Sequence, residues 1–301
     1  MHAIGIDIGG TKIAGGVVNA EGEILLKKQY PSPADDTQAM EDAVVQLIRE
    51  LAEGYDIAAA GVAAAGFISG NGSLVYYAPN IAWRNEPLKA KLEARLDVPV
   101  FIDNDANAAG WAEYRFGAGR GVKHMTMLTI GTGVGGAIIA NRELFTGGFG
   151  AGAEIGHMRM VPDGLECGCG QRGCFEQYGS GRALMRYIQE ETGKATLTND
   201  EGKELLAAGD EAALRGLATL GTWIGTAAAS LSAVLDPELY VIGGGVAPAG
   251  EALLAPMRAA FEANVSARGF HPEPKFVIAE FVNDAGIVGA ADLARRHAKA
   301  E

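Results

Sequence analysis

Three cysteines and one histidine have the types and spacing that point most directly to a chemical site. Cys167, Cys169 and Cys174 lie within eight residues, and nine residues separate His157 from the first of them. Three thiolates and one imidazole form the tetrahedral donor set that structural zinc prefers. An odd, tight cluster cannot be fully paired as intrachain disulfides, and buried free thiols beside a surface histidine would not need this spacing. We therefore predict a structural zinc site in the loop 157–174, called the zinc loop below.

A second group of polar residues follows the apolar run 98–102. It consists of Asp103, Asn104, Asp105 and Asn107, and a helical pattern begins directly after it. We expect one of the two aspartates to cap that helix, but capping does not require so dense a set of polar groups. An aspartate can also accept the proton of an attacking hydroxyl group in phosphoryl transfer. This group is therefore a candidate for acid–base chemistry.

Three glycine-containing turns follow strand-like apolar runs. They comprise Gly9, Gly10, Thr11 and Lys12 after Asp7, then Gly131, Thr132 and Gly133, then Gly243, Gly244 and Gly245. Glycines let backbone N–H groups approach phosphate oxygens, and Lys12 can neutralise their charge. The spacing is neither that of a P-loop nor that of the dinucleotide fingerprint. One such turn alone would usually be structural, but three at strand ends are suited to an extended nucleotide.

The elements that position these residues alternate between strand and helix. Short apolar runs predict buried strands at 2–8, 58–65, 98–102, 125–130 and 239–242. Helical spacing predicts helices over 37–53, 182–192 and 211–234 and from about residue 284 to the end. The succession of strand, glycine turn and returning strand occurs twice, at 2–18 and 125–140, which indicates an internal duplication. This alternation predicts the α/β class.

The length of 301 residues favours two lobes. We place the boundary near Ala108, although the composition does not change there. The predicted small α/β lobe comprises residues 1–107 and 284–301. The predicted large α/β lobe comprises 108–283 and contains the zinc loop.

The charge balance excludes some partners. There are 25 Lys and Arg against 37 Asp and Glu, and the formal charge of −12 would repel a nucleic-acid backbone. The most apolar run, 57–68, is too short to span a bilayer. Residues 1–10 lack the charged segment that opens a secretory signal. We therefore expect a cytoplasmic protein that binds neither nucleic acid nor membrane.

The quoted motifs resemble the ROK family of sugar kinases and repressors. The most specific part is the run Cys-Gly-Cys-Gly-x-x-Gly-Cys-x-Glu at 167–176 together with Glu-x-Gly-His at 154–157, and the resemblance extends from Ile4 to about Ala294. It implies the actin-like/hexokinase (ribonuclease H-like) fold, with duplicated βββαβα halves and a nucleotide cleft between two lobes. It also implies ATP as a ligand and a magnesium ion held indirectly by Asp7.

The resemblance assigns roles to single residues. By matching positions, Asp105 is the catalytic base and Asn104 a sugar ligand. The other sugar-binding residues that it implies are Asn80, Glu154, His157 and Glu176. One ring nitrogen of His157 can ligate zinc while the other faces a sugar hydroxyl, so the metal would hold the sugar pocket rather than react.

The stretches 104–120, 161–165, 176–178 and 286–293 resemble the bacterial, actinobacterial-type glucokinases of this family. The resemblance thus implies phosphorylation of the 6-hydroxyl of glucose. Mannose, fructose, N-acetylglucosamine and N-acetylmannosamine remain alternatives, because they present similar hydroxyl groups. Polyphosphate is a less suitable donor for so acidic a chain.

Two non-enzymatic alternatives fit the sequence less well. A sugar-sensing ROK regulator would carry a basic helix-turn-helix module before the first glycine turn, whereas the first strand here begins by Ala3. A sugar-binding module without activity would lack Asp7, Lys12 or Asp105, and all three are present. The family resemblance also implies a homodimer or homotetramer.

Overall fold

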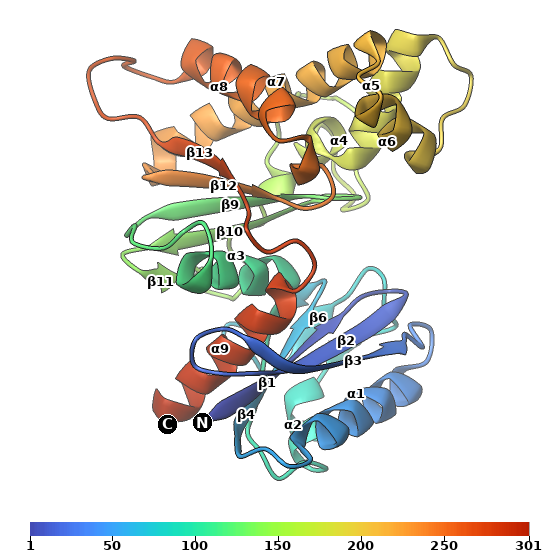
Figure 1. Cartoon of the computed structure of the whole chain (residues 1–301), viewed down its shortest axis with the longest axis vertical. Coiled ribbons are helices and arrows are strands. Elements are labelled where there is room, and N and C mark those ends of the chain that lie inside the picture. Colours follow the sequence, from blue (N-terminus) through green and yellow to red (C-terminus); the bar gives the residue numbers. More distant parts are fainter. Residues whose placement is uncertain (301) are drawn as a thin grey trace. The chain divides into compact units, whose positions relative to one another are not determined.

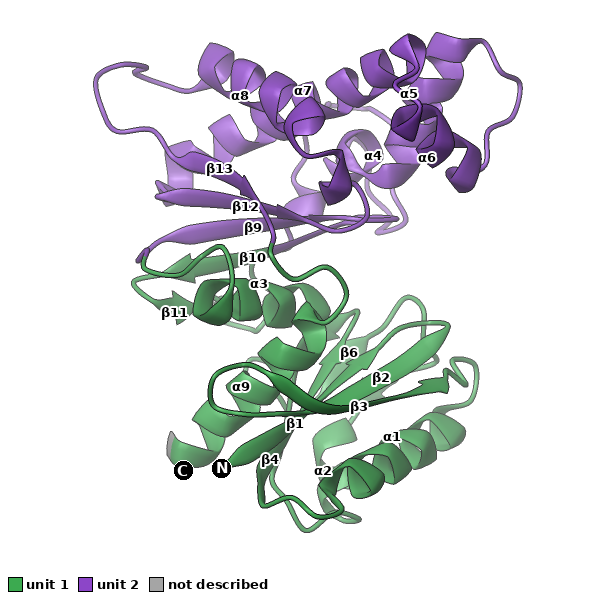
Figure 2. Ribbon diagram, in the orientation of Figure 1, with its two compact units in different colours: residues 1–121, 137–153, 280–301 green, residues 122–136, 154–279 purple. Residues whose placement is uncertain are grey.

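The computed structural model describes residues 1–300 and divides the chain into two compact units (Figures 1 and 2). Unit 1 comprises residues 1–121, 137–153 and those from 280 onward, and unit 2 comprises 122–136 and 154–279. The lobes predicted from the sequence divide the chain at other residues and stay a prediction. By its contacts, the segment 108–121 belongs to unit 1.

The first sheet lies in unit 1 and has the strand order β3-β2-β1-β4-β8. Its strands are β1 (His2–Ile8), β2 (Lys12–Val18), β3 (Ile24–Pro31), β4 (Ile57–Ala64) and β8 (Val100–Asn104). The first three form an antiparallel meander, and β1, β4 and β8 run parallel. Strand β4 is almost continuously buried, as expected for a central strand covered on both faces, whereas the edge strand β3 alternates between half-buried and exposed residues.

Four helices belong to unit 1: α1 (Thr37–Ala52), α2 (Leu88–Glu93), α3 (Asp105–Phe116) and α9 (Ala285–Ala300). Helix α9 packs very closely on the sheet. A Cβ placed on Gly5 would lie 1.8 Å from the carbonyl oxygen of Ile287, and one placed on Gly61 would lie 1.9 Å from that of Ala290. Only glycine permits this approach, so these two positions in the strands fix the place of α9.

Unit 1 also contains a small antiparallel sheet of order β5-β6-β7. Its strands are β5 (Phe67–Ile68), β6 (Val75–Tyr77) and β7 (Arg84–Glu86). The turn that carries Asn80 lies between β6 and β7 and is therefore held at both ends by sheet pairing.

The second large sheet has the order β11-β10-β9-β12-β13. Its strands are β9 (Met125–Ile130), β10 (Val134–Ala140), β11 (Glu143–Leu144), β12 (Leu239–Gly243) and β13 (Lys275–Ile278). Strand β12 pairs in parallel with β9 and β13. In both sheets the first three strands of a repeat lie side by side in the order third, second, first. Two parallel strands then follow beside the first strand. This common order confirms the predicted duplicated α/β fold.

The remaining helical elements belong to unit 2. They are η1 (Ile155–His157), α4 (Glu176–Gly179), α5 (Gly181–Thr192), α6 (Asn199–Ala207), α7 (Glu211–Leu235), η2 (Ala247–Ala249) and α8 (Glu251–Asn264). Helix α7 is long and apolar enough to cross a membrane, but half of its apolar window is buried in the structure. It packs against α5 and α8, and a Cβ on Gly225 would lie 2.1 Å from the carbonyl oxygen of Met257. These are the features of a core helix.

Candidate functional site

The polar group after residue 102 forms the junction between β8 and α3. Asn104 is the N-cap of α3, and its Oδ1 accepts hydrogen bonds from the backbone N–H groups of Ala106 (2.8 Å) and Asn107 (3.2 Å). Its Nδ2 donates to the carbonyl oxygen of Gly66 at 3.0 Å. The expectation that Asp103 or Asp105 caps the helix was therefore wrong. The cap is the asparagine between them, which fixes the conformation of the turn.

Asp103 supports this junction from within unit 1. Its side chain is buried, and its Oδ1 accepts hydrogen bonds from the backbone N–H of Asn104 (2.7 Å) and from Nδ2 of Asn107 (2.8 Å). Burial raises the pKa of Asp103 to about 6, although both hydrogen bonds oppose this shift. The carboxylate of Asp103 therefore holds the turn in place, although it is itself poorly solvated.

Asp105 is the first residue of α3 and lies near Asp7 at the end of β1. Burial raises the pKa of Asp105. Burial and the nearby charge of Asp105 raise the pKa of Asp7 to about 6, whereas the charge of Lys12 lowers it. Two neighbouring carboxylates with raised pKa values repel each other, and a divalent cation would relieve that repulsion. Asp7 therefore offers a hard oxygen donor of the kind that Mg²⁺ prefers.

The start of α9 also approaches Asp7. A Cβ placed on Gly286 would lie 2.8 Å from the carboxyl carbon of Asp7. Asp284, which directly precedes α9, forms an ion pair with Lys27, and both charges act on Asp7. The charge of Asp7 is thus set by residues from both ends of the chain.

The first glycine turn brings Asn80 close to the phosphate-binding candidates of unit 1. The backbone N–H of Gly9 donates to the carbonyl oxygen of Lys12 at 2.9 Å, which closes the turn. A Cβ placed on Gly10 would lie 3.3 Å from the Cβ of Asn80. Arg84, which the sequence did not indicate, donates to the carbonyl oxygens of three residues on either side of Asn80: Ala78, Ile81 and Trp83. It thereby fixes the turn that presents Asn80.

In unit 2, the second glycine turn contacts Glu176. The backbone N–H of Val134 donates to Oε2 of Glu176 at 3.1 Å. Arg182 connects the two, because its Nη2 lies 3.1 Å from Oε1 of Glu176 and its Nε donates to the carbonyl oxygen of Thr132 at 2.9 Å. The structure thus joins a predicted sugar ligand to a predicted nucleotide turn. Arg182 was missed, because a single arginine in a helical pattern carries no signal of its own.

The third glycine turn lies beside the second. Gly244 has a φ of +84°, and a Cβ on it would lie 2.5 Å from the carbonyl oxygen of Ile130, the last residue of β9. The backbone N–H of Val246 also donates to that oxygen, at 3.3 Å. The ends of β9 and β12 therefore place Gly131 and Gly244 next to each other, as expected for adjacent parallel strands.

The donor atoms of the zinc loop converge. One ring nitrogen of His157 and the sulfurs of Cys167, Cys169 and Cys174 all lie within 4.8 Å of one another. Two Zn–S bonds of about 2.3 Å at a tetrahedral angle separate their sulfurs by about 3.8 Å. The sulfurs of Cys169 and Cys174 are 3.7 Å apart, and Nδ1 of His157 lies 3.7 Å from the sulfur of Cys167. The predicted donor set therefore fits a zinc ion.

The loop depends on tight backbone geometry. Gly173 has a φ of +75°, and a Cβ on it would lie 1.7 Å from the carbonyl oxygen of Val161. Burial and the neighbouring thiols raise the pKa of Cys174 to about 12, so the thiolate form requires a nearby cation. Because His157 ends η1, the zinc loop also fixes the short turn that carries Glu154.

That turn packs against the start of β10. A Cβ on Gly156 would lie 2.2 Å from the carbonyl oxygen of Val134, whose N–H donates to Glu176. Gly156, between Glu154 and His157 in the turn, and Glu176 thus both contact Val134 of unit 2. The remaining predicted residues, Asp7, the first glycine turn, Asn80, Asn104 and Asp105, lie in unit 1.

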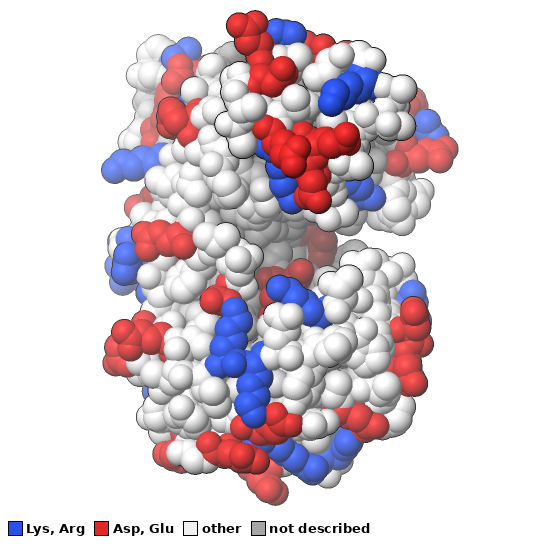
Figure 3. All heavy atoms as spheres, turned by 45° about the vertical axis from the view of Figure 1, so that its right-hand side comes forward, with Lys and Arg blue, Asp and Glu red and all other residues white. Residues whose placement is uncertain are grey.

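The charged side chains on one face of the molecule are of both signs. Figure 3 shows acidic and basic side chains interspersed over one face of the molecule. Together with the net charge of −12, this distribution does not favour a nucleic-acid backbone.

Comparison with known proteins identifies similar chains. A model of the ROK family matches residues 3–297. The glucokinase of Streptomyces coelicolor is 43% identical over 311 residues, covering 97% of each chain. An N-acetylmannosamine kinase of Escherichia coli is 35% identical, covering 98% of this chain and 99% of its own. The crystal structure of a ROK family glucokinase from Streptomyces griseus, in complex with glucose and AMPPNP, superimposes with a TM-score of 0.88 and 42% identity, covering 98% of this chain and all of that chain.

Proposed function

The chain belongs to the ROK family, and from that premise we propose that it is an ATP-dependent glucokinase, which phosphorylates the 6-hydroxyl of glucose to give glucose 6-phosphate. The similarity to glucokinases over 97% of the chain supports the substrates. The observation that carries the mechanism is the aspartate pair in unit 1. Asp105 stands at the start of α3, close enough to Asp7 to raise its pKa.

Asp105 acts as the base in this proposal. As the 6-oxygen forms its bond to the γ-phosphorus, its proton passes to the carboxylate of Asp105, the bond to the β-phosphate oxygen breaks, and ADP leaves. The raised pKa of Asp105 makes it a better proton acceptor than an exposed aspartate. Asn104 has one amide N–H left after its bond to Gly66 and can donate it to the sugar.

The other sugar contacts come from Asn80, Glu154, His157 and Glu176. Carboxylate and amide groups that are held by neighbours can read several hydroxyls at once, and such sites reject an analogue that lacks one. Arg84 holds the turn of Asn80, and Arg182 holds Glu176. These two arginines are therefore positioning residues in the proposal.

The glycine turns would bind the nucleotide. The N–H groups of Gly9 and Gly131 close their own turns by donating to the carbonyl oxygens of Lys12 and Gly133. Gly10, Gly133 and the run 243–245 would therefore offer the backbone N–H groups to phosphate oxygens, Thr11 and Thr132 add hydroxyl groups, and the exposed Lys12 adds a positive charge. Asp7 would hold Mg²⁺ through water, and the ion would supply charge neutralisation at the phosphates.

Zinc has a structural role in the proposal. His157, Cys167, Cys169 and Cys174 would fill its four positions, which leaves no open position for a reacting group. The ion thus stabilises the loop, and His157 can offer its second ring nitrogen to a sugar hydroxyl.

A second candidate is a kinase for another hexose. The 35% identity to an N-acetylmannosamine kinase favours that sugar as the first alternative. Mannose, fructose and N-acetylglucosamine are further members of the panel to be tested. We also propose a cytoplasmic location and a homodimer or homotetramer, from the resemblance to the family.

The test is ADP release by the purified chain with ATP, Mg²⁺ and each hexose in turn. The proposal predicts the highest kcat/KM with glucose. A higher value with N-acetylmannosamine would favour the second candidate, and no ADP release with any hexose would exclude a kinase.

A further inference from the structure

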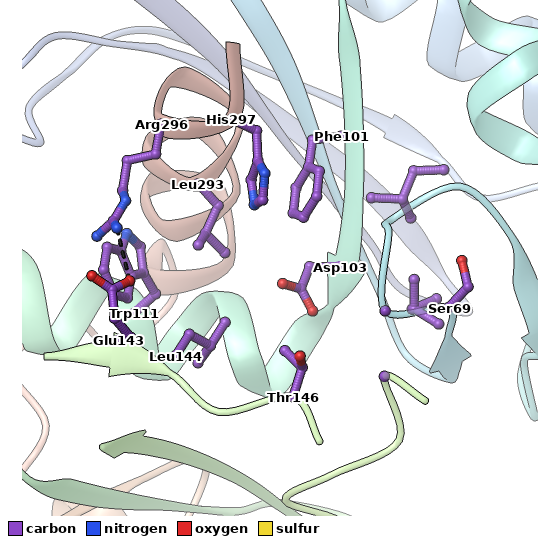
Figure 4. A pocket seen from close by; sticks show the side chains of 14 residues that line it. Ser69, Phe101, Asp103, Trp111, Glu143, Leu144, Thr146, Leu293, Arg296 and His297 are labelled. Carbon is purple, nitrogen blue, oxygen red and sulfur yellow. Dashed lines mark hydrogen bonds and ion pairs between the residues drawn. The ribbon is translucent and has the colours of Figure 1, made fainter. Parts of the chain in front are cut away.

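A cavity of about 250 Å³ lies within unit 1. Side chains from β8, α3 and α9 line it together with the segments 68–70 and 143–150. Figure 4 shows Phe101 and Asp103 projecting from β8 toward the same space, opposite Leu144, Thr146 and Leu293. No residue that the proposed function assigns to sugar, nucleotide or zinc belongs to this lining. The cavity is therefore separate from the proposed active-site residues.

Asp103 is the buried charged group in the lining of this cavity, whereas Glu143, Arg296 and His297 are exposed. Its side chain is only 8% exposed, and Figure 4 shows its carboxylate facing the open space. Both of its hydrogen bonds, from Asn104 and Asn107, end on Oδ1. A buried carboxylate is poorly solvated, and the two hydrogen bonds to Oδ1 compensate only part of its charge. Oδ2 is thus available to a ligand.

The other ionisable side chains of the lining have contacts of their own. Arg296 forms an ion pair with Glu143 at 2.8 Å, and its guanidinium carbon lies 4.7 Å from the ring centroid of Trp111. The ring of His297 stacks on Phe101 with centroids 3.7 Å apart and an interplanar angle of 16°. These contacts leave Asp103 as the group whose charge a ligand would have to match.

About half of the cavity wall is apolar. Phe101, Trp111, Leu144 and Leu293 all contribute to the lining. An anion entering here would approach the carboxylate of Asp103, and an uncharged apolar molecule would leave that carboxylate without a partner. A molecule that combines a positive charge with a compact apolar body satisfies both features.

We propose that this cavity binds a small organic ammonium ion, whose charged nitrogen pairs with Oδ2 of Asp103 and whose apolar body packs against Phe101, Leu144 and Leu293. The carboxylate of Asp103 also accepts the backbone N–H of Asn104. Asp103 therefore connects the bound ion to the turn that carries Asp105. Binding of the ammonium ion to the cavity does not depend on the proposed function. An effect of that binding on phosphorylation rests on the proposed function.

The test uses benzylamine as the probe, titrated into the full chain at pH 7.5 with calorimetry and with ¹⁵N spectra of the backbone amides. Benzyl alcohol has nearly the same shape without the charge, and benzoate carries the opposite charge. The proposal predicts saturable binding of benzylamine at least tenfold tighter than that of either control, with a shift of the Asn104 amide signal. No saturable binding of benzylamine, or equal binding of benzyl alcohol, would overturn it.

Two variants locate the site. Leu144→Trp fills the cavity from a short edge strand and should weaken benzylamine binding at least tenfold, whereas Leu25→Trp, on the exposed side of β3, should not change it. Asp103→Asn keeps the shape and should remove the preference for benzylamine over benzyl alcohol. Circular dichroism shows whether each variant is folded. Unchanged benzylamine binding in folded Leu144→Trp would overturn the proposal, whatever the outcome of the hexose assay.

Discussion

The turn at the start of α3 and the zinc loop hold their functional groups by different means. In the turn, Asn104 caps the helix and Asp103 accepts two hydrogen bonds, so regular structure fixes Asp105 without any ion. In the zinc loop, little regular structure surrounds His157, and the four donor atoms come together around the space for a metal. In the proposed function, the base Asp105 thus lies on a rigid element, whereas the sugar ligand His157 lies on an element that needs a metal.

The strongest way to test the turn is to change the base alone. Asp105→Asn keeps the size of the side chain and an oxygen for the N–H of Ala106, but an amide cannot accept the proton. We expect kcat to fall by about 10²- to 10⁴-fold, the usual range for general-base catalysis. ADP release under saturating glucose and ATP measures it. Asp35→Asn, at an exposed aspartate of the same unit, is the matched control and should keep normal turnover.

The zinc loop can be tested through its metal. Cys169→Ala removes one of four ligands, so the variant should lose zinc, and we expect glucose affinity to fall about 10- to 100-fold as the contacts of Glu154 and His157 are displaced. Metal analysis and calorimetry measure the two effects. Leu165→Ala, at an exposed position of the same loop, should retain both. If zinc-free Cys169→Ala bound glucose normally, the metal would not be needed to hold the sugar pocket.

We also expect the activity to depend on pH through the two aspartates, Asp7 and Asp105. The pKa of Asp7 is raised to about 6, so its ionised form is present at neutral pH and is lost as the pH falls through about 6. Burial raises the pKa of Asp105 as well, so its ionised form is also favoured by higher pH. We expect kcat/KM to fall by up to tenfold per pH unit below that point. Added Mg²⁺ should move the fall to lower pH, because the cation favours the charged form of Asp7. A flat profile between pH 5 and 7 would contradict the assignment of Asp7.

The smallest expected effect concerns the link between Glu176 and the second glycine turn. Arg182 is well exposed, so its ion pair contributes little by itself, and Arg182→Gln should raise KM for glucose only a few-fold through a less fixed Glu176. Arg215→Gln, on α7, breaks an ion pair with Glu191 at the end of α5 and should leave KM unchanged. Equal effects of both variants on KM for glucose would contradict the positioning role of Arg182.

The sequence predicted those features whose signal is local. Cys167, Cys169, Cys174 and His157 define a donor set by type and spacing alone, and the strands and the turns that follow them could be recognised by apolar runs ending in glycine. The choice of Asn104 as the cap could not be made, because three adjacent residues, Asp103, Asn104 and Asp105, are all good caps.

Features that depend on distant segments were beyond the sequence. Gly5 indicates a close backbone approach, but its partner, Ile287, lies at the far end of the chain. Arg84 and Arg182 act on carbonyl oxygens, which every residue possesses, so no pattern identifies them. The place of α3 in unit 1 likewise follows from its packing against α9.

The division of labour between the two regions is tested most directly by measuring glucose binding to Asp105→Asn and Cys169→Ala side by side, with ADP release from the same preparations. We predict that Asp105→Asn binds glucose with an affinity within about threefold of that of the unchanged chain but releases almost no ADP. We predict that Cys169→Ala loses its affinity for glucose together with its zinc. Near-normal ADP release by Asp105→Asn would contradict the role of Asp105 as the base.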